Sequence, residues 1–312
     1  MIKLGMSLPQ LHWYDLRTDV AAVARGYEEI GLDSAWAFER LLVPEDQSGS
    51  GAHGLFQMPD VPWPDYYRDA PEPLTVLTTA GAVTSRIELG TNVLVAPLHL
   101  PVRLAKTLAS VDEIIGGRLI AGLGTGWSID EYQATAPRPF AERGAALDEF
   151  LDVAEAVWGP DPVKFHNERY EITPATVGPK PARRIPVVLG GGRGRALDRI
   201  ARRADGWLPT NLTPAQIGTQ LTQLRQTAAD HGRDPGEIGC ITQVIKRDFE
   251  RVTTAGRAAY AGDFEQLTED VAALAEAGVD HVFLASSSAA RDRAELLDWA
   301  AAFHSAVRAA GL

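Results

Sequence analysis

Hydrophobic residues follow two alternating patterns along this chain. Short apolar runs rich in β-branched residues are typical of strands buried on both faces. Longer segments with apolar residues every third or fourth position are typical of helices with one buried face. The two patterns alternate about eight times between Ile2 and Ala309. This rhythm predicts an α/β fold built on a parallel sheet.

The segment from Ile87 to Trp127 shows the rhythm most plainly. An apolar run over 87–95 predicts a strand, and Pro101 favours the start of a helix because proline has no amide hydrogen to lose there. A pair of glycines ends this helix, and a second strand follows over 119–123. Two parallel strands joined by a helix bind ligands at their carboxyl ends, so Asn92 and residues 124–126 are candidate binding positions.

The whole pattern predicts a single (β/α)8 barrel, a TIM barrel, that forms one domain over residues 1–312. Insertions are expected after strand 2, over Leu41–Pro73, and after strand 4, over Gly159–Pro186, with a small hairpin in the second. Thr18 and Thr213 are expected to cap helices. The expected strands cover residues 2–8, 34–38, 87–95, 119–123, 186–189, 206–208, 238–245 and 282–285.

The first insertion has no sustained periodicity and is rich in aromatic residues. Loops of this length usually serve as lids or binding segments, so we interpret it as the wall of a substrate pocket, with a flexible surface insertion as the alternative. Candidate pocket residues are Trp13, His53, Phe56 and Trp127. The aromatic residues suggest an apolar or aromatic small-molecule ligand, although they could equally close over a cofactor.

Charge and composition exclude several classes of protein. The net charge of -11 argues against general binding to nucleic acid or to an anionic membrane, since both need a basic surface. The single cysteine, Cys240, excludes an intrachain disulfide, and the absence of a leader pattern or long apolar run favours a cytoplasmic protein. Histidines lack metal-ligand spacing and no Gly-x-Ser-x-Gly motif occurs, so neither a metal site nor a serine hydrolase is predicted.

A basic cluster between Lys180 and Arg203 stands out in this acidic chain. Gly190, Gly191 and Gly192 follow a strand and precede a helix, where backbone amides and the helix dipole favour an anion. Arg193 lies at the same positive helix end, which indicates a phosphate site. The alternative is a tight turn among surface arginines, and Arg199, Arg202 and Arg203 are expected to be such surface residues.

Four segments together resemble the bacterial luciferase-like monooxygenase family. The run TNVLVAP followed by PVRLAKTLASVDEIIGGRLIAGLGTGW is similar to the family's central signature. KLGMSLPQ, GLDSAWAFERLLVP and PVVLGGGRGRALDRIARRADGWLP fit the family in the same order. Members use FMN or the deazaflavin coenzyme F420. The resemblance implies a barrel with the cofactor phosphate at Gly190 to Arg193.

The resemblance also implies positions around the flavin ring. Gly124, Thr125 and Gly126 would lie beside the ring, and Asn92 would lie beneath it on the third strand, often at an unusual backbone bulge. An asparagine satisfied by neighbouring backbone is the alternative for Asn92. Trp127 would line the pocket or be a buried structural residue.

The candidate catalytic residues are Glu39, Arg40 and His12. Deazaflavin-dependent relatives commonly carry an acid followed by histidine here; Glu39 keeps the acid, and Arg40 departs from the pattern. Arginine stays protonated at neutral pH and cannot act as a base, which leaves the proton donor open. A surface pair between Glu39 and Arg40 is the alternative, and Glu131 is expected to be a surface residue. His12 and His53 are the spare candidates for acid chemistry.

The function implied by the resemblance is hydride transfer between F420 and an organic substrate. The alternative is an FMN-dependent monooxygenase that receives reduced flavin from a partner reductase. A cofactor-free binding barrel is a third hypothesis, from a different functional class. A homodimer is expected because family members commonly dimerise.

Overall fold

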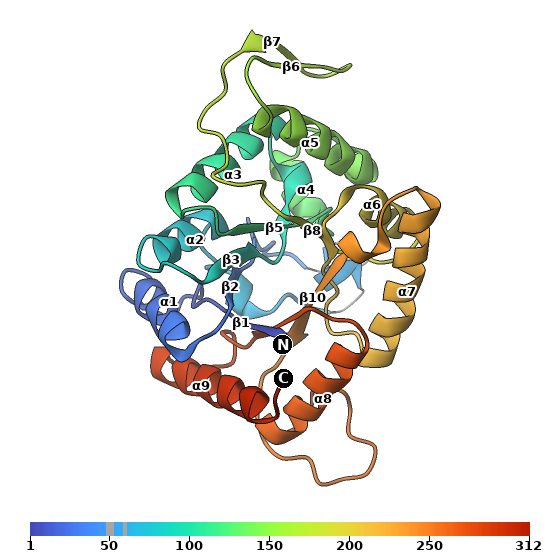
Figure 1. Ribbon diagram of the computed structural model, residues 1–312. Helices are drawn as coiled ribbons and strands as arrows, with labels where there is room; N and C mark the ends of the chain where they lie inside the picture. Colours follow the sequence, from blue (N-terminus) through green and yellow to red (C-terminus); the bar gives the residue numbers. More distant parts are fainter. Residues whose placement is uncertain (48–52, 59–60) are drawn as a thin grey trace.

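Eight parallel strand positions close into a barrel in the computed structural model, which describes residues 1–47, 53–58 and 61–312 (Figure 1). The hydrogen-bonded order is β3-β2-β1-β11-β10-β9-β8-β5-β4, and pairing of β3 with β5 closes the ring. The TIM barrel prediction is therefore confirmed. The barrel strands are β1 (Lys3–Ser7), β2 (Ser34–Ala37), β3 (Glu88–Thr91), β4 (Leu94–Val95), β5 (Leu119–Gly124), β8 (Val187–Leu189), β9 (Gly206–Trp207), β10 (Gly239–Ile245) and β11 (His281–Ala285).

The third barrel strand differs from the prediction of one continuous strand over 87–95. It ends at Thr91 and resumes at Leu94, with a cis peptide bond between Asn92 and Val93. Up to this point the strand stays paired with β2, because the Asn92 N–H donates to the Ala37 carbonyl at 2.7 Å and so continues the β2–β3 ladder. β4 then pairs with the last residues of β5. This interruption occurs at the carboxyl end of the barrel, where a ligand would bind.

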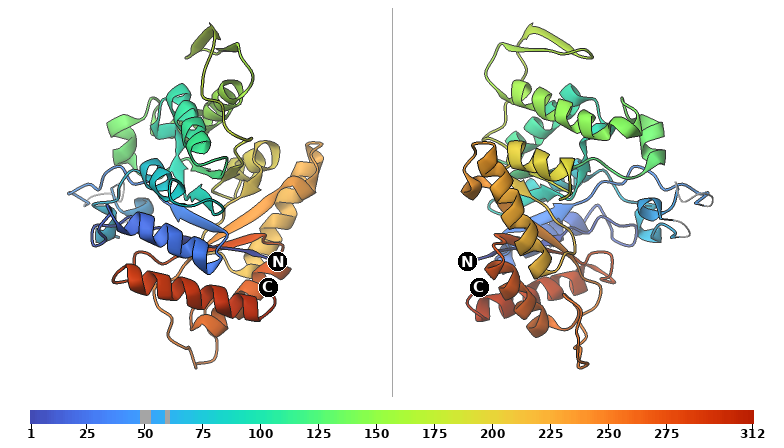
Figure 2. Two further views of the ribbon diagram at one scale, coloured as in Figure 1. Left: turned by 60° about the vertical axis from the view of Figure 1, so that its left-hand side comes forward. Right: turned by 90° about the vertical axis from the view of Figure 1, so that its right-hand side faces the viewer.

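Helices cover the outside of the barrel, and Figure 2 shows the ring of helices from two further sides. Thr213 caps its helix through a capping box with Gln216, as predicted. The Thr18 prediction was wrong: its hydroxyl lies near Asp15 and Asp19 and makes no cap hydrogen bond. The helices are α1 (Asp19–Ile30), α2 (Pro73–Gly81), α3 (Pro101–Ile114), α4 (Ile129–Thr135), α5 (Arg143–Trp158), α6 (Arg195–Arg203), α7 (Pro214–Asp230), α8 (Phe264–Glu276) and α9 (Arg293–Ala309).

Aromatic side chains fill the barrel beneath the expected site. Trp36 and Phe283 stack with ring centroids 4.4 Å apart, and both are almost fully buried. Ser34 holds this layer in place, because its hydroxyl accepts from the Trp36 indole at 2.7 Å and contacts His281 at 2.6 Å. Gly90 is required here, since a Cβ atom would lie 2.3 Å from the Trp36 ring. The barrel therefore has a rigid packed floor.

Both predicted insertions are present. The hairpin of β6 (Val163–His166) and β7 (Glu171–Ala175) projects from the barrel at the top of Figure 1. The first insertion, over 41–73, contains two short 3-10 helices, η1 (Leu55–Gln57) and η2 (Asp65–Tyr67), among the described residues.

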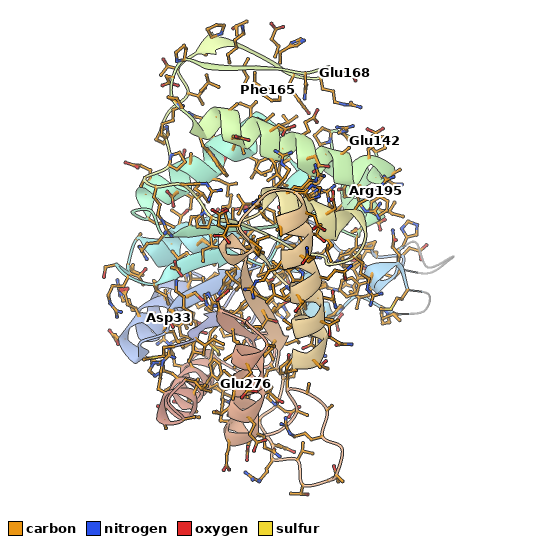
Figure 3. All side chains as sticks on the ribbon, turned by 45° about the vertical axis from the view of Figure 1, so that its right-hand side comes forward. Asp33, Glu142, Phe165, Glu168, Arg195 and Glu276 are labelled. Carbon is orange, nitrogen blue, oxygen red and sulfur yellow. The ribbon has the colours of Figure 1, made fainter. Side chains whose placement is uncertain are left out.

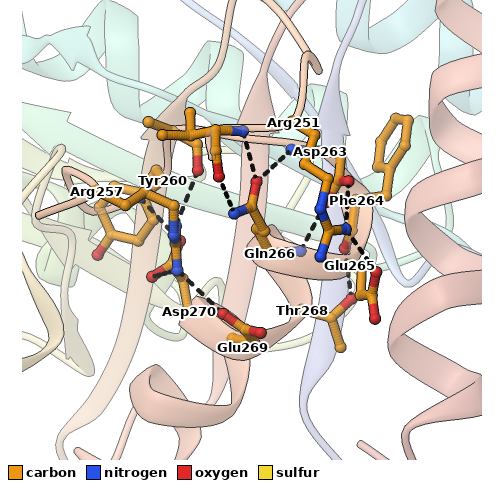
Figure 4. Close-up of polar contacts among 12 residues, drawn as sticks. Arg251, Arg257, Tyr260, Asp263, Phe264, Glu265, Gln266, Thr268, Glu269 and Asp270 are labelled. Atoms are coloured by element: carbon orange, nitrogen blue, oxygen red, sulfur yellow. Dashed lines mark hydrogen bonds and ion pairs between the residues drawn. The ribbon is translucent and has the colours of Figure 1, made fainter. Parts of the chain in front are cut away.

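A third irregular segment, residues 246–263, follows β10 and is tied to α8 by polar contacts (Figure 4). Arg257 donates to both oxygens of Asp270, at 2.6 and 3.1 Å, and the Tyr260 amide donates to the same carboxylate. The Tyr260 hydroxyl donates to the carbonyl of Leu212, which lines the central cavity. The segment therefore buttresses one wall of the cavity.

Within these described ranges, no helix is long and apolar enough to cross a membrane, and no three His, Cys, Asp or Glu side chains are grouped to hold a metal ion.

Candidate active site

A cavity of about 1270 Å³ opens at the carboxyl ends of the barrel strands. Ligand pockets usually measure about 300–1,000 Å³, so there is room for a cofactor and a second molecule. All but three of the predicted site residues line it. These lining residues are Glu39, Arg40, Phe56, Asn92, Gly124, Thr125, Gly126, Trp127, Gly190, Gly191, Gly192 and Arg193.

In the cavity, Val93 lies between two glycines at the carboxyl ends of neighbouring strands, Gly124 and Gly190. We name these three residues the Val93 cradle. A Cβ atom at Gly124 would lie 2.7 Å from Val93 Cγ2, so glycine is needed for the close approach. At Gly190 a Cβ atom would meet only ordinary contacts of 3.7 Å, from Leu123 and Val93. Val93 is half-buried and lines the cavity between these glycines. A flat ring could lie against this cradle.

Three arginines line one end of the cavity, next to the glycine turn. Arg193 and Arg195 are exposed beside the N-terminus of α6, and Arg143 lies over the Phe140 ring at 4.2 Å. Figure 3 shows Arg195 and Glu142 on one rim of the barrel, away from Asp33 at the start of β2. Helix amides and arginines together suit a phosphate. We name Arg143, Arg193 and Arg195 the basic end.

Arg199 does not belong with the surface arginines as expected. It is 8% exposed and donates to both oxygens of Asp148, at 2.6 and 2.9 Å. This pair joins α6 to α5 behind the basic end. Arg202 and Arg203 are surface residues that pair with Asp198 and Asp152 respectively.

The carboxylate of Glu39 contacts both β4 and the turn that follows it. Its Oε2 accepts from the Val95 amide at 2.6 Å, and its Oε1 lies 2.7 Å from Nε2 of His99. The alternative of a surface pair between Glu39 and Arg40 is therefore not found, because each side chain has another partner. Glu39 reaches the cavity, whereas His99 is not a lining residue and keeps about a third of its side chain exposed.

His99 is a residue that the sequence analysis missed. It follows the short 3-10 turn η3 (Ala96–Leu98) and precedes Pro101. One feature of the sequence could have identified it: His99 lies just past the carboxyl end of the third strand, where site residues are expected. Burial lowers the pKa of His99, but the hydrogen bond and charge of Glu39, with the charge of Glu72, raise it more, so the pKa lies above its ordinary value of 6.5.

Replacing Glu39 by glutamine should lower the pKa of His99 to below the ordinary histidine value. Burial lowers this pKa, and in the variant only the charge of Glu72 would still raise it. Because the folded pKa is raised in the wild type, the pair stabilises the fold below the unfolded pKa, and this contribution is lost as pH rises through the folded pKa. Histidine-selective NMR titration measures the change. Exposed His166, on the hairpin, is the control. Unchanged titration of His99 in E39Q would contradict the pairing.

Arg40 lies in an aromatic cage. Its guanidinium carbon is 4.8–4.9 Å from the ring centroids of Trp63, Tyr67 and Trp127. Its Nη1 lies 2.8 Å from Oε2 of Glu131, and both side chains are less than a tenth exposed. This contact is an ion pair without aligned hydrogen-bond geometry, so Nε and Nη1 have no hydrogen-bond partner within the described ranges. Arg40 thus connects the first insertion to the segment after β5.

Glu131 was wrongly expected at the surface. It is 3% exposed on α4, and its Oε1 accepts from the Leu41 amide at 2.8 Å. Burial raises the pKa of Glu131, and the charge of Arg40 lowers it again only in part. Spacing along α4 could not reveal this, because the partner lies about ninety residues earlier in the chain.

Three predicted site residues are not among those that line the cavity. Exposed His12 lies 3.6 Å from Asp69. Trp13 donates its indole N–H to the Ala290 carbonyl, and His53 Nδ1 lies 2.8 Å from Asp130. The roles of these three residues stay predictions.

Comparison with known proteins gives the family. The sequence pattern described as luciferase-like monooxygenase matches residues 14–248. An uncharacterized protein of Mycobacterium tuberculosis is 32% identical over 235 residues, which cover 74% of this chain and 79% of the relative. An F420-dependent glucose-6-phosphate dehydrogenase of Kineococcus radiotolerans is 30% identical over 227 residues, covering 72% and 61%.

Solved structures agree on the fold. An F420-dependent secondary alcohol dehydrogenase superimposes with a TM-score of 0.76 at 17% identity, over 98% of this chain and 99% of that one. The monooxygenase RslO1 from Streptomyces bottropensis gives 0.75 at 17% identity, over the whole of both chains. With more than half of its length matched by the family pattern, this chain belongs to the luciferase-like monooxygenase family, and its relatives include F420-dependent dehydrogenases.

Proposed function

We propose that this protein is an F420-dependent oxidoreductase that transfers hydride between the deazaflavin and an organic substrate. The observation that carries the proposal is the glycine turn and basic end, which open into the same cavity as the Val93 cradle and Glu39. The F420-dependent glucose-6-phosphate dehydrogenases among its relatives support the choice of cofactor.

Each part of the cavity has a role in this proposal. Gly190 to Arg193 would hold the cofactor phosphate through backbone amides and a guanidinium. Asn92, Val93 and Gly124 would support the ring. The bound deazaflavin would supply or accept the hydride, and the chain positions it and excludes water.

Glu39 would hold or deliver a proton at its carboxylate, because it is the acid that faces the cavity beside the cradle. His99 keeps that carboxylate hydrogen-bonded on its other side. Arg40 would not exchange protons, since a guanidinium stays charged and this one is paired with Glu131.

An FMN-dependent monooxygenase is the second candidate. Flavin-type neighbours such as the long-chain alkane monooxygenase LadA share the fold, with a TM-score of 0.74 at 13% identity. Both cofactors carry a phosphate, so the basic end suits either. Reduced FMN would activate oxygen and require a partner reductase, whereas the deazaflavin carries hydride. A small organic substrate and a homodimer remain predictions under both candidates.

Cofactor titration followed by tryptophan fluorescence tests the proposal. Oxidised F420 should bind more tightly than FMN, and Arg193→Ala should weaken F420 binding about tenfold, the typical effect of one charge-assisted hydrogen bond. Arg202→Ala is the matched control, because Arg202 lies on α6, the helix that follows Arg193, and pairs with Asp198 outside the cavity.

Preference for FMN with oxygen uptake on the reduced flavin would favour the monooxygenase. Absence of binding by both cofactors would favour the non-catalytic binding barrel.

A further inference from the structure

The cavity has a second end that differs in character from the basic end. Aromatic side chains from β2, the first insertion and the turn after β5 line it. We name this set the aromatic end, and its members are Phe38, Phe56, Tyr66, Tyr67 and Trp127. The rings contact one another, with Phe56 4.8 Å from Trp127 and Phe38 5.7 Å from Tyr67 between centroids. Burial raises the pKa of Tyr67 to about 12, so its hydroxyl stays uncharged.

Both charged residues at the aromatic end already have partners. Glu39 is paired with His99, and Arg40 is paired with Glu131 inside its aromatic cage. Arg247, whose charge acts on Tyr67, is exposed and outside the cavity lining. The seven residues outside the described ranges contain no lysine or arginine. The described lining therefore presents no free cation at this end.

An anionic ligand would bind poorly at the aromatic end. It would lose its hydration against apolar rings and would lie beside the carboxylates of Glu39 and Glu131, with no unpaired cation to compensate. A planar uncharged ligand would keep most of its solvation energy and could stack on the rings. The two ends therefore favour opposite classes of molecule.

We infer that the aromatic end is a substrate site for uncharged, planar aromatic or conjugated compounds, and that it rejects phosphorylated and carboxylated ones. The inference rests on the proposed function only where it calls the ligand a substrate. It separates this chain from its relatives named for glucose 6-phosphate, a dianion that would need a free cation at the substrate position.

Saturation-transfer NMR with three probes tests the inference. Acetophenone is uncharged and planar, 4-acetylbenzoate adds one carboxylate to the same skeleton, and glucose 6-phosphate is a phosphorylated sugar. The protein is first saturated with F420, so that the probes report on the other end of the cavity. Acetophenone should bind, 4-acetylbenzoate should bind at least about tenfold more weakly, and glucose 6-phosphate should give no signal.

A gain-of-affinity variant locates the site. Phe56 lines the aromatic end and is 56% exposed, so its replacement should not disturb the core. Phe56→Arg adds a free cation and should bring 4-acetylbenzoate to the affinity of acetophenone or beyond. Phe56→Gln is the matched control and should leave the carboxylate weak.

Two results would overturn the inference: equal or tighter binding of either anion by the wild type, or no binding of acetophenone. Should F420 fail to bind, the proposed function fails separately. The binding of the three probes is then compared on the Arg193→Ala, Arg195→Ala double variant, so that anions bind less well at the basic end. Tight binding of an anion, or no binding of acetophenone, would again overturn the inference.

Discussion

Replacing Glu131 by glutamine is expected to release the first insertion from the barrel and to raise its rate of proteolytic cleavage by roughly two orders of magnitude. The change keeps the shape of the side chain and removes its charge. Arg40 then remains charged and about nine-tenths buried without its counter-ion. Breaking a buried pair in this way costs about 3–5 kcal/mol, part of which the aromatic cage offsets through cation-π attraction.

The segment can escape this cost by opening locally, since Trp63 and Tyr67 reach the barrel through the Arg40 cage. When opening and closing are faster than cleavage, the proteolysis rate follows the population of the open form. Limited proteolysis with mass spectrometry of residues 41–73 measures it.

Two controls separate this effect from general loss of charge. Glu295→Gln, in the first turn of α9, removes the partner of the exposed residue Arg291 and should change cleavage of the first insertion little. The double replacement Arg40→Met, Glu131→Leu removes both charges and should recover most of the lost protection, because no unpaired charge stays buried. Cleavage of E131Q at the wild-type rate would show that the pair does not hold the segment.

Gly122→Ala is expected to be the most damaging single methyl addition in the barrel, with a loss of roughly 3–5 kcal/mol or failure to fold. A Cβ atom at Gly122 would lie 1.9 Å from the carbonyl oxygen of Thr91. The obstacle is backbone, which cannot rotate away as a side chain can. The Thr91 hydroxyl also donates to the Gly122 carbonyl at 2.7 Å, so the two strands are tied together at this point.

Chemical denaturation of the purified variant measures the loss. Gly190→Ala is the matched control: it lies at the end of neighbouring β8, and its added Cβ would meet only contacts of 3.7 Å. The control should keep near wild-type stability. If G122A were as stable as G190A, the close approach of β3 and β5 described above would be wrong.

Much of the candidate site could be predicted from the sequence because it is local. Gly190 to Arg193 and Gly124 to Trp127 each lie within one strand-to-helix turn, and parallel topology brings all such turns to one end of the barrel. The surroundings of Trp13 and His53 could not be predicted in this way, because their polar contacts are with Ala290 and Asp130, far away in the sequence.

By itself the sequence determined the barrel, its insertions and the turns that line the cavity, since these follow from the spacing of apolar residues, glycines and prolines along the chain. Only the tertiary structure decided which charges are paired. Arg40 meets Glu131 and Glu39 meets His99 across separations of 60 to about 90 residues, and no spacing rule reaches that far. It also decided where the third strand is interrupted, between Thr91 and Leu94, with a cis peptide bond between Asn92 and Val93. The lack of a free cation at the aromatic end arises from these long-range pairs.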